Sequence, residues 1–314
     1  MKIFFAALKN LALTDFDCEF LELLPGVKIT NKTDVKDRIL TELVRDAIGI
    51  IESNTIHNSD AFVYYEYEGT EKFLKGHTNL ESLNFILLWI DDFLKNSWLH
   101  KDNCITCDIG YLIDFSKKEV TEASSLRLQY MLTMADGDIC DVTLSKKDLT
   151  EISDIHDKLE TYLFKKDSGS TKFMLEKNFS RIGRALLFVK QAREARNLAY
   201  KITNYCAALE TLFTTESAEL SHKLAERTAY FISSAPERLT IYKVLKKAYS
   251  IRSKLTHGSS LEQKSILEIP DISIATDKII RRVFEKVIFD DKILELFDSR
   301  NSKIDEYFEN LVFG

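Results

Sequence analysis

The amino-acid sequence predicts an α+β protein made of two parts. These are a mixed α/β domain over residues 1–170 and an all-α helical bundle over residues 171–314. Two observations predict this division. Strand-like and helix-like patterns are interspersed in the first half of the chain, whereas after residue 171 the apolar residues recur only with helical spacing. Residues 165–171 (KKDSGST) are polar and small, as expected of a boundary between domains.

Strands are predicted at two places in the N-terminal half. Residues 61–68 (AFVYYEYE) are rich in aromatic and β-branched side chains and end at Gly69, which is typical of a strand. Residues 126–134 and 139–144 flank the turn-like segment ADGD at 135–138, which predicts a β-hairpin.

Helices are predicted at residues 34–52 and 80–97 of the same half. In the second of these, five apolar residues share one helical face: Leu83, Ile86, Leu87, Ile90 and Phe93. The N-terminal half therefore reads as α+β, and it contains no motif that indicates a particular chemistry.

The C-terminal half predicts five helical segments. Apolar residues recur every three or four positions from 179 to 212, which indicates one long helix or two stacked end to end. A second helix covers about residues 217–232. A third begins at a capping box formed by Ser234 and Glu237 and stops at Gly258. Two more helices are expected at residues 271–289 and 292–311. Together the five helical segments should form a bundle.

The third of these helices places an arginine among apolar residues. Arg252 occupies a position in the apolar stripe formed by Ile241, Leu245, Ala248 and Leu255. A cation on the core side of a helix is costly without a partner or a water-filled cleft, so we expect Arg252 to line a groove. His257 lies five residues further on, about 140° around the helix axis and about 7.5 Å along it. Both can reach one phosphate if His257 bends back past the helix end, or if two facing helices share a cleft, which predicts a homodimer.

Arginine and histidine are suited to the cleavage of RNA. RNA carries its own nucleophile, the 2′-hydroxyl, so cleavage requires a base, an acid and a cation for the phosphate oxygens. Histidine titrates near neutral pH and serves as base or acid. Arginine stays charged and binds phosphate through two donors. No metal and no cofactor are needed for this chemistry.

Residues 249–258 (YSIRSKLTHG) resemble the signature of HEPN domains, in particular the ApeA-like HEPN group of bacterial defence proteins. Residues 204–213 (NYCAALETLF) and 219–227 (ELSHKLAER) resemble further blocks of that group in the same order. The resemblance implies a metal-independent endoribonuclease that leaves 2′,3′-cyclic phosphate ends. Such a protein is usually dimeric and acts in antiviral defence, abortive infection or as a toxin, on host or phage RNA, with tRNA a candidate substrate.

The resemblance assigns the catalytic pair to Arg252 and His257. Ser253, Lys254 and Glu210 are candidate supporting residues, and Ser253 stands where many HEPN proteins carry Asn, Asp or His. Glu210 could neutralise Arg252, orient His257 or be a solvated carboxylate. Arg193 and Arg196 are candidate RNA contacts, with a solvated basic helix face as the alternative. A non-catalytic HEPN module that binds RNA, a nucleotide or a protein partner is the alternative function.

Charge and cysteine usage bear on partners and location. Residues 176–314 carry 23 Lys/Arg and 19 Asp/Glu, a net charge of +4, whereas residues 1–175 carry 20 and 30, a net charge of −10. RNA is therefore expected on the helical part, and the acidic part is expected to act as a sensor for a phage-derived or nucleotide trigger. Five scattered cysteines indicate a reducing cytoplasm. A zinc or redox role for Cys104 and Cys107 lacks paired ligand spacing. No run of 18 apolar residues occurs, so no membrane partner is expected.

Overall fold

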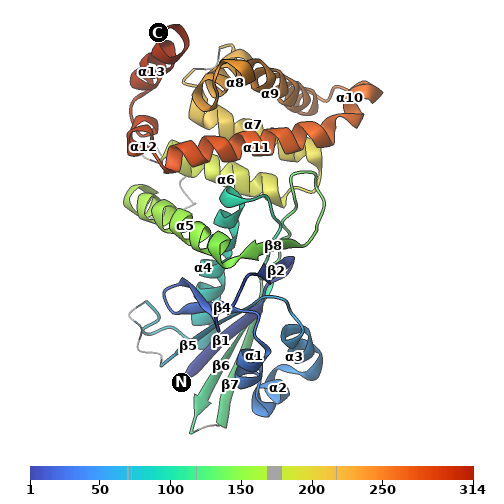
Figure 1. The fold of residues 1–314 in the computed structure, drawn as a ribbon, viewed down its shortest axis with the longest axis vertical. Helices are drawn as coiled ribbons and strands as arrows, with labels where there is room; N and C mark the ends of the chain where they lie inside the picture. Colours follow the sequence, from blue (N-terminus) through green and yellow to red (C-terminus); the bar gives the residue numbers. More distant parts are fainter. Residues whose placement is uncertain (69–70, 72, 118, 168–178, 217) are drawn as a thin grey trace. The chain divides into compact units, whose positions relative to one another are not determined.

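The computed structural model describes the chain except residues 69–70, 72, 118, 168–178 and 217, and it forms two compact units (Figure 1). The first contains Met1–Met131 and Ile139–His156, and the second contains Leu132–Asp138 and Asp157–Gly314. The chain passes from one unit to the other within α5 (Lys146–Asp167). Within the expected boundary segment, residues 168–171 lie outside the described part of the chain.

The first unit is built on a six-stranded antiparallel sheet with the strand order β3-β4-β5-β1-β6-β7. Strand β5 confirms the strand predicted at 61–68. The sheet strands are β1 (Lys2–Ala7), β3 (Leu21–Leu24), β4 (Val27–Thr30), β5 (Phe62–Tyr67), β6 (Ile109–Ser116) and β7 (Glu119–Arg127).

The hairpin predicted around residues 135–138 is wrong. Its turn exists, since Gly137 has a φ of +87° and donates its amide to the Met134 carbonyl. However, Leu126 and Arg127 end strand β7, which pairs with β6. The strand after the turn, β8 (Val142–Ser145), pairs in parallel with β2 (Leu11–Thr14). Residues 128–134 are not a strand, so of the two predicted strands only the second is largely confirmed. Its partner could not be identified from local alternation, because pairing is decided by residues far away in the sequence.

Helices cover both faces of this sheet. The helix expected at 34–52 is three short helices that pack on the face containing Phe5 and Tyr64, namely α1 (Thr33–Ile39), α2 (Glu42–Ile48) and α3 (Ile50–His57). Gly49, with a φ of +98°, separates the last two, because a left-handed residue ends a helix. Helix α4 (Asn79–His100) confirms the second predicted helix and begins with a capping box of Thr78 and Glu81. It lies on the other face, where Gly110 leaves room for Leu83 and Leu87.

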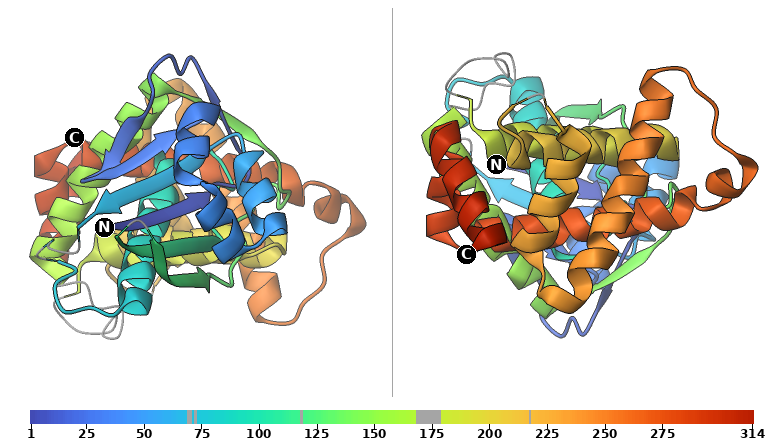
Figure 2. Two further views of the ribbon diagram at one scale, coloured as in Figure 1. Left: turned by 90° about the horizontal axis from the view of Figure 1, so that it is seen from below. Right: turned by 90° about the horizontal axis from the view of Figure 1, so that it is seen from above.

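The second unit is helical, as the sequence predicts (Figure 2). Its helices after α5 are α6 (Arg181–Glu194), α7 (Leu198–Phe213), α8 (Leu220–Ile232), α9 (Ala235–Thr256), α10 (Gln263–Leu267), α11 (Ile269–Ile288), α12 (Asp291–Phe297) and α13 (Asn301–Phe313). The segment 179–212 is two helices that pack side by side in opposite directions, not end to end. Arg181 at the start of α6 donates to the carbonyl of Thr211 near the end of α7, over 2.8 Å. Asn197 caps α7 and so separates the two helices.

Two other details of the second unit differ from the sequence prediction. The last predicted helix is split into α12 and α13. Ser234 is the N-cap of α9, as predicted, but its side chain makes no capping bond, and Glu237 instead pairs with Arg282 at 2.9 Å. The core near these helices contains the fully buried ring of Phe213, which packs edge-on against three others, Phe231, Phe297 and Phe308.

Candidate functional site

Helix α9 packs against α7 and α11 through a small apolar cluster, which fixes the side of α9 that Arg252 occupies. The cluster consists of Ile202 and Cys206 from α7, Ala248 and Ile251 from α9, and Ile272 from α11. Since Ile251 and Ala248 are buried, Arg252 lies at the edge of this contact, and its side chain is 27% exposed. Arg252, which was expected to line a groove, is therefore partly buried beside α7.

Arg252 is held by two neighbouring side chains. Its Nη2 lies 3.4 Å from both carboxylate oxygens of Glu210 on α7. Its Nη1 donates to the hydroxyl of Tyr249 over 3.1 Å, and the guanidinium lies 5.1 Å from the centre of the Tyr249 ring. Such a set of contacts fixes a guanidinium through an ion pair, a hydrogen bond and a cation–π contact at once.

Glu210 contacts Arg252 in this arrangement and is not a solvated carboxylate, since its side chain is only 18% exposed. Burial raises the pKa of Glu210, and Arg252 and Tyr249 oppose that rise only in part. Its Oε1 is buried and has no hydrogen bond, although Nη2 is within ion-pair distance. Burial likewise raises the pKa of Tyr249, and it raises the pKa of the Cys206 thiol beneath them to about 12. The carboxylate thus neutralises part of the arginine charge, less strongly as it becomes protonated.

Tyr249 was missed by sequence reasoning as a site residue. It lies three residues before Arg252 on one helix, a spacing at which side chains are neighbours. The signal was therefore available, but an i,i+3 Tyr–Arg pair is common on helices. Only the structure shows that the hydroxyl and the guanidinium meet.

His257 lies at the end of α9 and is exposed. The helix ends in a Schellman motif, in which Ser259 donates to the Lys254 carbonyl over 2.9 Å and Gly258 donates to the Leu255 carbonyl over 3.3 Å. Gly258 has a φ of +67°, which confirms its predicted role as the helix terminator. The His257 amide itself donates to the Ser253 carbonyl over 3.0 Å. Ser253 and Lys254 therefore contribute backbone carbonyls to this helix end, and their side chains are half-buried.

Arg252 and His257 are not brought together within one chain. Arg252 is turned towards Glu210, whereas His257 projects at the helix end, and no hydrogen bond joins the two described side chains. The helix between them is regular to Thr256, so the divergence of about 140° expected from helical geometry applies. One chain thus offers an arginine site and a histidine site that face different directions.

The two other candidate RNA contacts differ in exposure. Arg193, in the last turn of α6, is buried, so its guanidinium is out of reach of an RNA phosphate in this structure. Arg196, in the connection between α6 and α7, is exposed. A basic face on one continuous helix would place both arginines on the surface. Instead the chain reverses between α6 and α7, so that Arg193 is buried and Arg196 is exposed.

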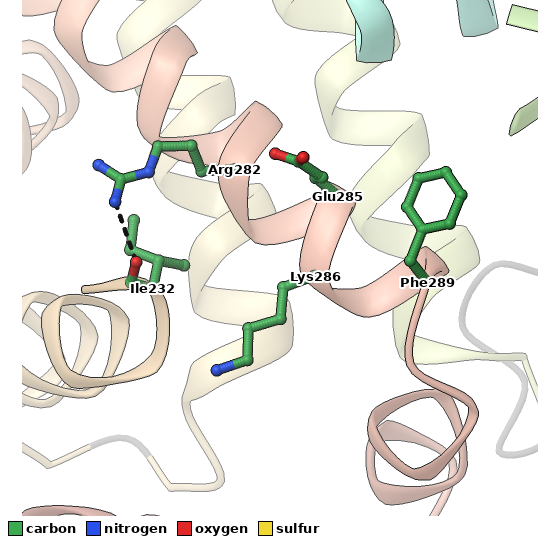
Figure 3. Close-up of a pocket in the computed structure, with 5 residues that line it drawn as sticks. All are labelled: Ile232, Arg282, Glu285, Lys286 and Phe289. Carbon is green, nitrogen blue, oxygen red and sulfur yellow. Dashed lines mark hydrogen bonds between the residues drawn. The ribbon is translucent and has the colours of Figure 1, made fainter. Parts of the chain in front are cut away.

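A second feature of the helical unit is an open cavity of about 390 Å³, drawn in Figure 3 and lined by Ile232, Arg282, Glu285, Lys286 and Phe289. Its two cations already have partners. Arg282 donates to the Ile232 carbonyl over 3.0 Å, and Lys286 donates to the Phe231 carbonyl over 2.7 Å. These contacts satisfy the carbonyls at the end of α8, as basic side chains near helix C-termini often do. The cations of this cavity therefore have a structural role.

Comparison with known proteins identifies no relative. No protein-family model, no curated protein and no solved structure matches this chain. Among the described residues, no group of three or more His, Cys, Asp or Glu side chains is placed to hold a metal ion. A membrane-crossing helix, which would have to be long and apolar, is not found in the described part of the chain.

Proposed function

We propose that this protein is a metal-independent endoribonuclease of the HEPN type, similar to the ApeA-like group, that acts on host or phage RNA in cytoplasmic antiviral defence. The observation that carries the proposal is the end of α9. There a fixed, partly exposed Arg252 and an exposed His257 lie within one short stretch of helix. Both residue types suit phosphodiester cleavage without a metal ion.

The proposed reaction is an internal transfer within RNA. His257 takes the proton from the 2′-hydroxyl, whose oxygen then attacks the adjacent phosphorus. The bond from phosphorus to the 5′-oxygen breaks, and that oxygen takes a proton from water, which leaves a 2′,3′-cyclic phosphate and a 5′-hydroxyl. Arg252 stabilises the negative charge that develops on the phosphate oxygens. The contacts to Tyr249 and Glu210 support this role, because they hold the guanidinium in one place before RNA binds.

The proposed site is composite and is formed by two copies of the chain. Within one protomer Arg252 and His257 diverge by about 140°, so one phosphate is not easily touched by both. In a symmetric dimer, His257 of one protomer can face Arg252 of the other, which gives two equal sites. The acidic N-terminal unit is proposed to sense the trigger, a phage component or a nucleotide.

The test is cleavage of total bacterial RNA and tRNA by the purified full chain in EDTA. The Arg252→Ala and His257→Ala variants are expected to lose at least about 100-fold in rate. His222→Ala is the matched control, since His222 is another exposed histidine of the helical unit. Fragments with 2′,3′-cyclic phosphate ends that persist in the control and vanish in both site variants would support the proposal. Equal cleavage by the wild type and both site variants would refute it.

A further inference from the structure

Two cysteines that are far apart in the sequence meet in the first unit. Cys104 precedes β6 and is fully buried, whereas Cys140 precedes β8 and is exposed. The thiol of Cys104 donates to the backbone carbonyl of Cys140, and its Sγ lies 3.2 Å from that oxygen. The two residues are therefore in direct contact, although 36 positions separate them in the chain.

Asn10 holds the two cysteine segments next to each other. Its side chain donates to the Cys104 carbonyl over 2.9 Å, and its own carbonyl accepts from the Val142 amide over 3.1 Å. Asn10 has a left-handed φ of +60°, which asparagine tolerates better than most residues. The parallel pair of β2 and β8 begins directly after it, with Leu11 opposite Val142 (Figure 1). The contact between Cys104 and Cys140 is thus fixed by backbone pairing on both sides.

The C-x2-C spacing of Cys104 and Cys107 does not supply such a pair. Thr106, between them, forms an antiparallel bridge with Lys9, so the chain is extended there. Extended backbone places residues three apart at roughly 10 Å, whereas a disulfide requires Cα atoms within about 7 Å. Burial also raises the pKa of Cys107, which keeps its thiol protonated and unreactive. Cys140, and not Cys107, is therefore the cysteine in reach of Cys104.

We propose that Cys104 and Cys140 are a redox-sensitive pair that closes into a disulfide when a low-molecular-weight disulfide is present. The exposed Cys140 thiolate attacks the small disulfide, forms a mixed disulfide and releases one small thiol. The Cys104 thiolate then attacks the Cys140 sulfur and releases the second small thiol. The protein loses two protons and two electrons, which reduce the small disulfide to two thiols. This proposal is independent of the proposed ribonuclease function.

The two thiols divide this reaction according to their exposure. The first attack, on a reagent in water, requires an exposed thiol, which Cys140 supplies. The second attack occurs inside the protein, where Cys104 is already in contact with the backbone of Cys140. Cys140 lies between the turn at 135–138 and β8, outside regular structure, so its side chain can move towards Cys104 without loss of strand pairing. An accessible thiol next to a second, resolving thiol is typical of redox sensors.

The disulfide fixes the place where the chain returns to the first unit. Leu132–Asp138 belong to the second unit, and Cys140 is the second residue after them. The loop closed by Cys104 and Cys140 contains this segment together with β6 and β7. A cross-link of this length restricts the unfolded chain, so the oxidised form should be more stable than the reduced form.

The first test treats the full chain with 2-hydroxyethyl disulfide and maps its peptides by mass spectrometry without reduction. This reagent is neutral, which suits a thiol flanked in the sequence by Asp138 and Asp141. We expect the wild type to lose two hydrogen atoms and to yield one pair of peptides joined through Cys104 and Cys140. Cys104→Ser should stop at the mixed disulfide and carry the adduct on Cys140 in at least about a tenfold larger fraction of molecules.

Cys18→Ser is the matched control, because Cys18 is a partly exposed cysteine of the same unit. It should leave the link between Cys104 and Cys140 unchanged. Serine at position 104 keeps a hydroxyl that can donate to the Cys140 carbonyl, so this variant should fold. If it does not, Cys140→Ser replaces an exposed residue and should leave Cys104 unmodified. Absence of the joined peptides in the wild type, or modification of Cys104 in Cys140→Ser, would overturn the proposal.

The second test measures the thermal stability of the first unit with and without the disulfide. Both tryptophans, Trp89 and Trp98, lie in that unit, so their fluorescence reports its unfolding. Closure of the loop should raise the unfolding midpoint by roughly 5–10 °C, and dithiothreitol should reverse the rise. The midpoint of Cys140→Ser should be the same before and after treatment. An oxidised wild type whose midpoint falls or stays unchanged would show that the two thiols do not meet in the native fold, and would refute the proposal.

Discussion

Removal of the Tyr249 hydroxyl should weaken the hold on Arg252 by an amount that can be measured without any assay of RNA cleavage. In Tyr249→Phe the ring that lies 5.1 Å from the guanidinium remains, but the 3.1 Å hydrogen bond is lost. A hydrogen bond to a charged group contributes about 1.5–3 kcal/mol to stability. Because Tyr249 and Arg252 are both partly exposed, water replaces part of that contribution. We expect a loss of about 1 kcal/mol in the free energy of unfolding.

The assay is a double-mutant cycle of Tyr249→Phe and Arg252→Ala. Urea unfolding of the full chain is followed by far-ultraviolet circular dichroism, which reports the helices, whereas both tryptophans, Trp89 and Trp98, lie in the first unit. The expected coupling energy is about 1 kcal/mol. Tyr242→Phe is the control, because Tyr242 lies ten residues before Arg252 on α9, where its hydroxyl pairs with His222. A coupling for Tyr249 no larger than that for Tyr242 would refute the structural reasoning.

Three further outcomes are expected. Burial raises the pKa of Glu210, so the folded state keeps its proton to higher pH than the unfolded state does. The stability of the wild type relative to Glu210→Gln should therefore be greatest below the unfolded pKa and decrease as the pH rises through the folded pKa. Urea unfolding at several pH values measures this difference, and a difference that increases with pH would contradict a raised pKa of Glu210. Gly258→Ala should cost about 1 kcal/mol, all of it from the left-handed backbone at a φ of +67°, because no atom lies within 4 Å of the added methyl group; a loss no larger than that of Ser259→Ala in the same urea assay would contradict this. Iodoacetamide at pH 8 should modify the exposed Cys140 and spare the buried Cys206, whose pKa is raised to about 12, and mass spectrometry of the peptides would reveal the reverse order.

The parts of the fold that could be predicted from the sequence depend on local periodicity. Strand β5 was predicted from its aromatic and β-branched residues and the glycine that follows them, and α4 from apolar residues on one helical face. Helix α9 was predicted from the capping signal at Ser234 and from Gly258 at its end. Helix boundaries inside a continuous pattern could not be placed. The pattern at 179–212 continues through the turn between α6 and α7, since each helix buries apolar residues and the two helices pack against each other. A periodic pattern records burial, and burial persists when the chain reverses.

Strand pairing was beyond sequence reasoning for a different reason. The hairpin predicted around residues 135–138 had suitable alternation and a suitable turn, but β8 found its partner in β2, about 130 residues earlier. A parallel pair of this kind is stabilised by the rest of the unit and not by its own turn. Helix α5 was missed for another reason. It is 22 residues long, but its many charged residues obscure the apolar face that it buries.

Of the two contacts that hold Arg252, the sequence offered the one with Glu210 as an alternative and did not indicate the one with Tyr249. Arg252 was expected to need a partner, and the structure supplies Glu210 and Tyr249, one from the neighbouring helix and one from the preceding turn. The sequence left a solvated Glu210 open as an alternative, because the packing of α9 on α7 that buries this carboxylate is not encoded by a short motif. The motif does fix the direction of His257 relative to Arg252, since five residues of regular helix separate them by about 140°.

The two halves of the candidate site differ in how far one chain prepares them. Arg252 has an ion-pair partner, a hydrogen bond and an aromatic face, so its position is set before any ligand binds. His257 has only its backbone fixed, by the helix end and Gly258, and its ring is exposed. A histidine intended to act within its own chain would need an orienting partner of the kind that Arg252 has. Its exposure is the arrangement expected if, as proposed, the surface that orients it belongs to a second copy of the chain.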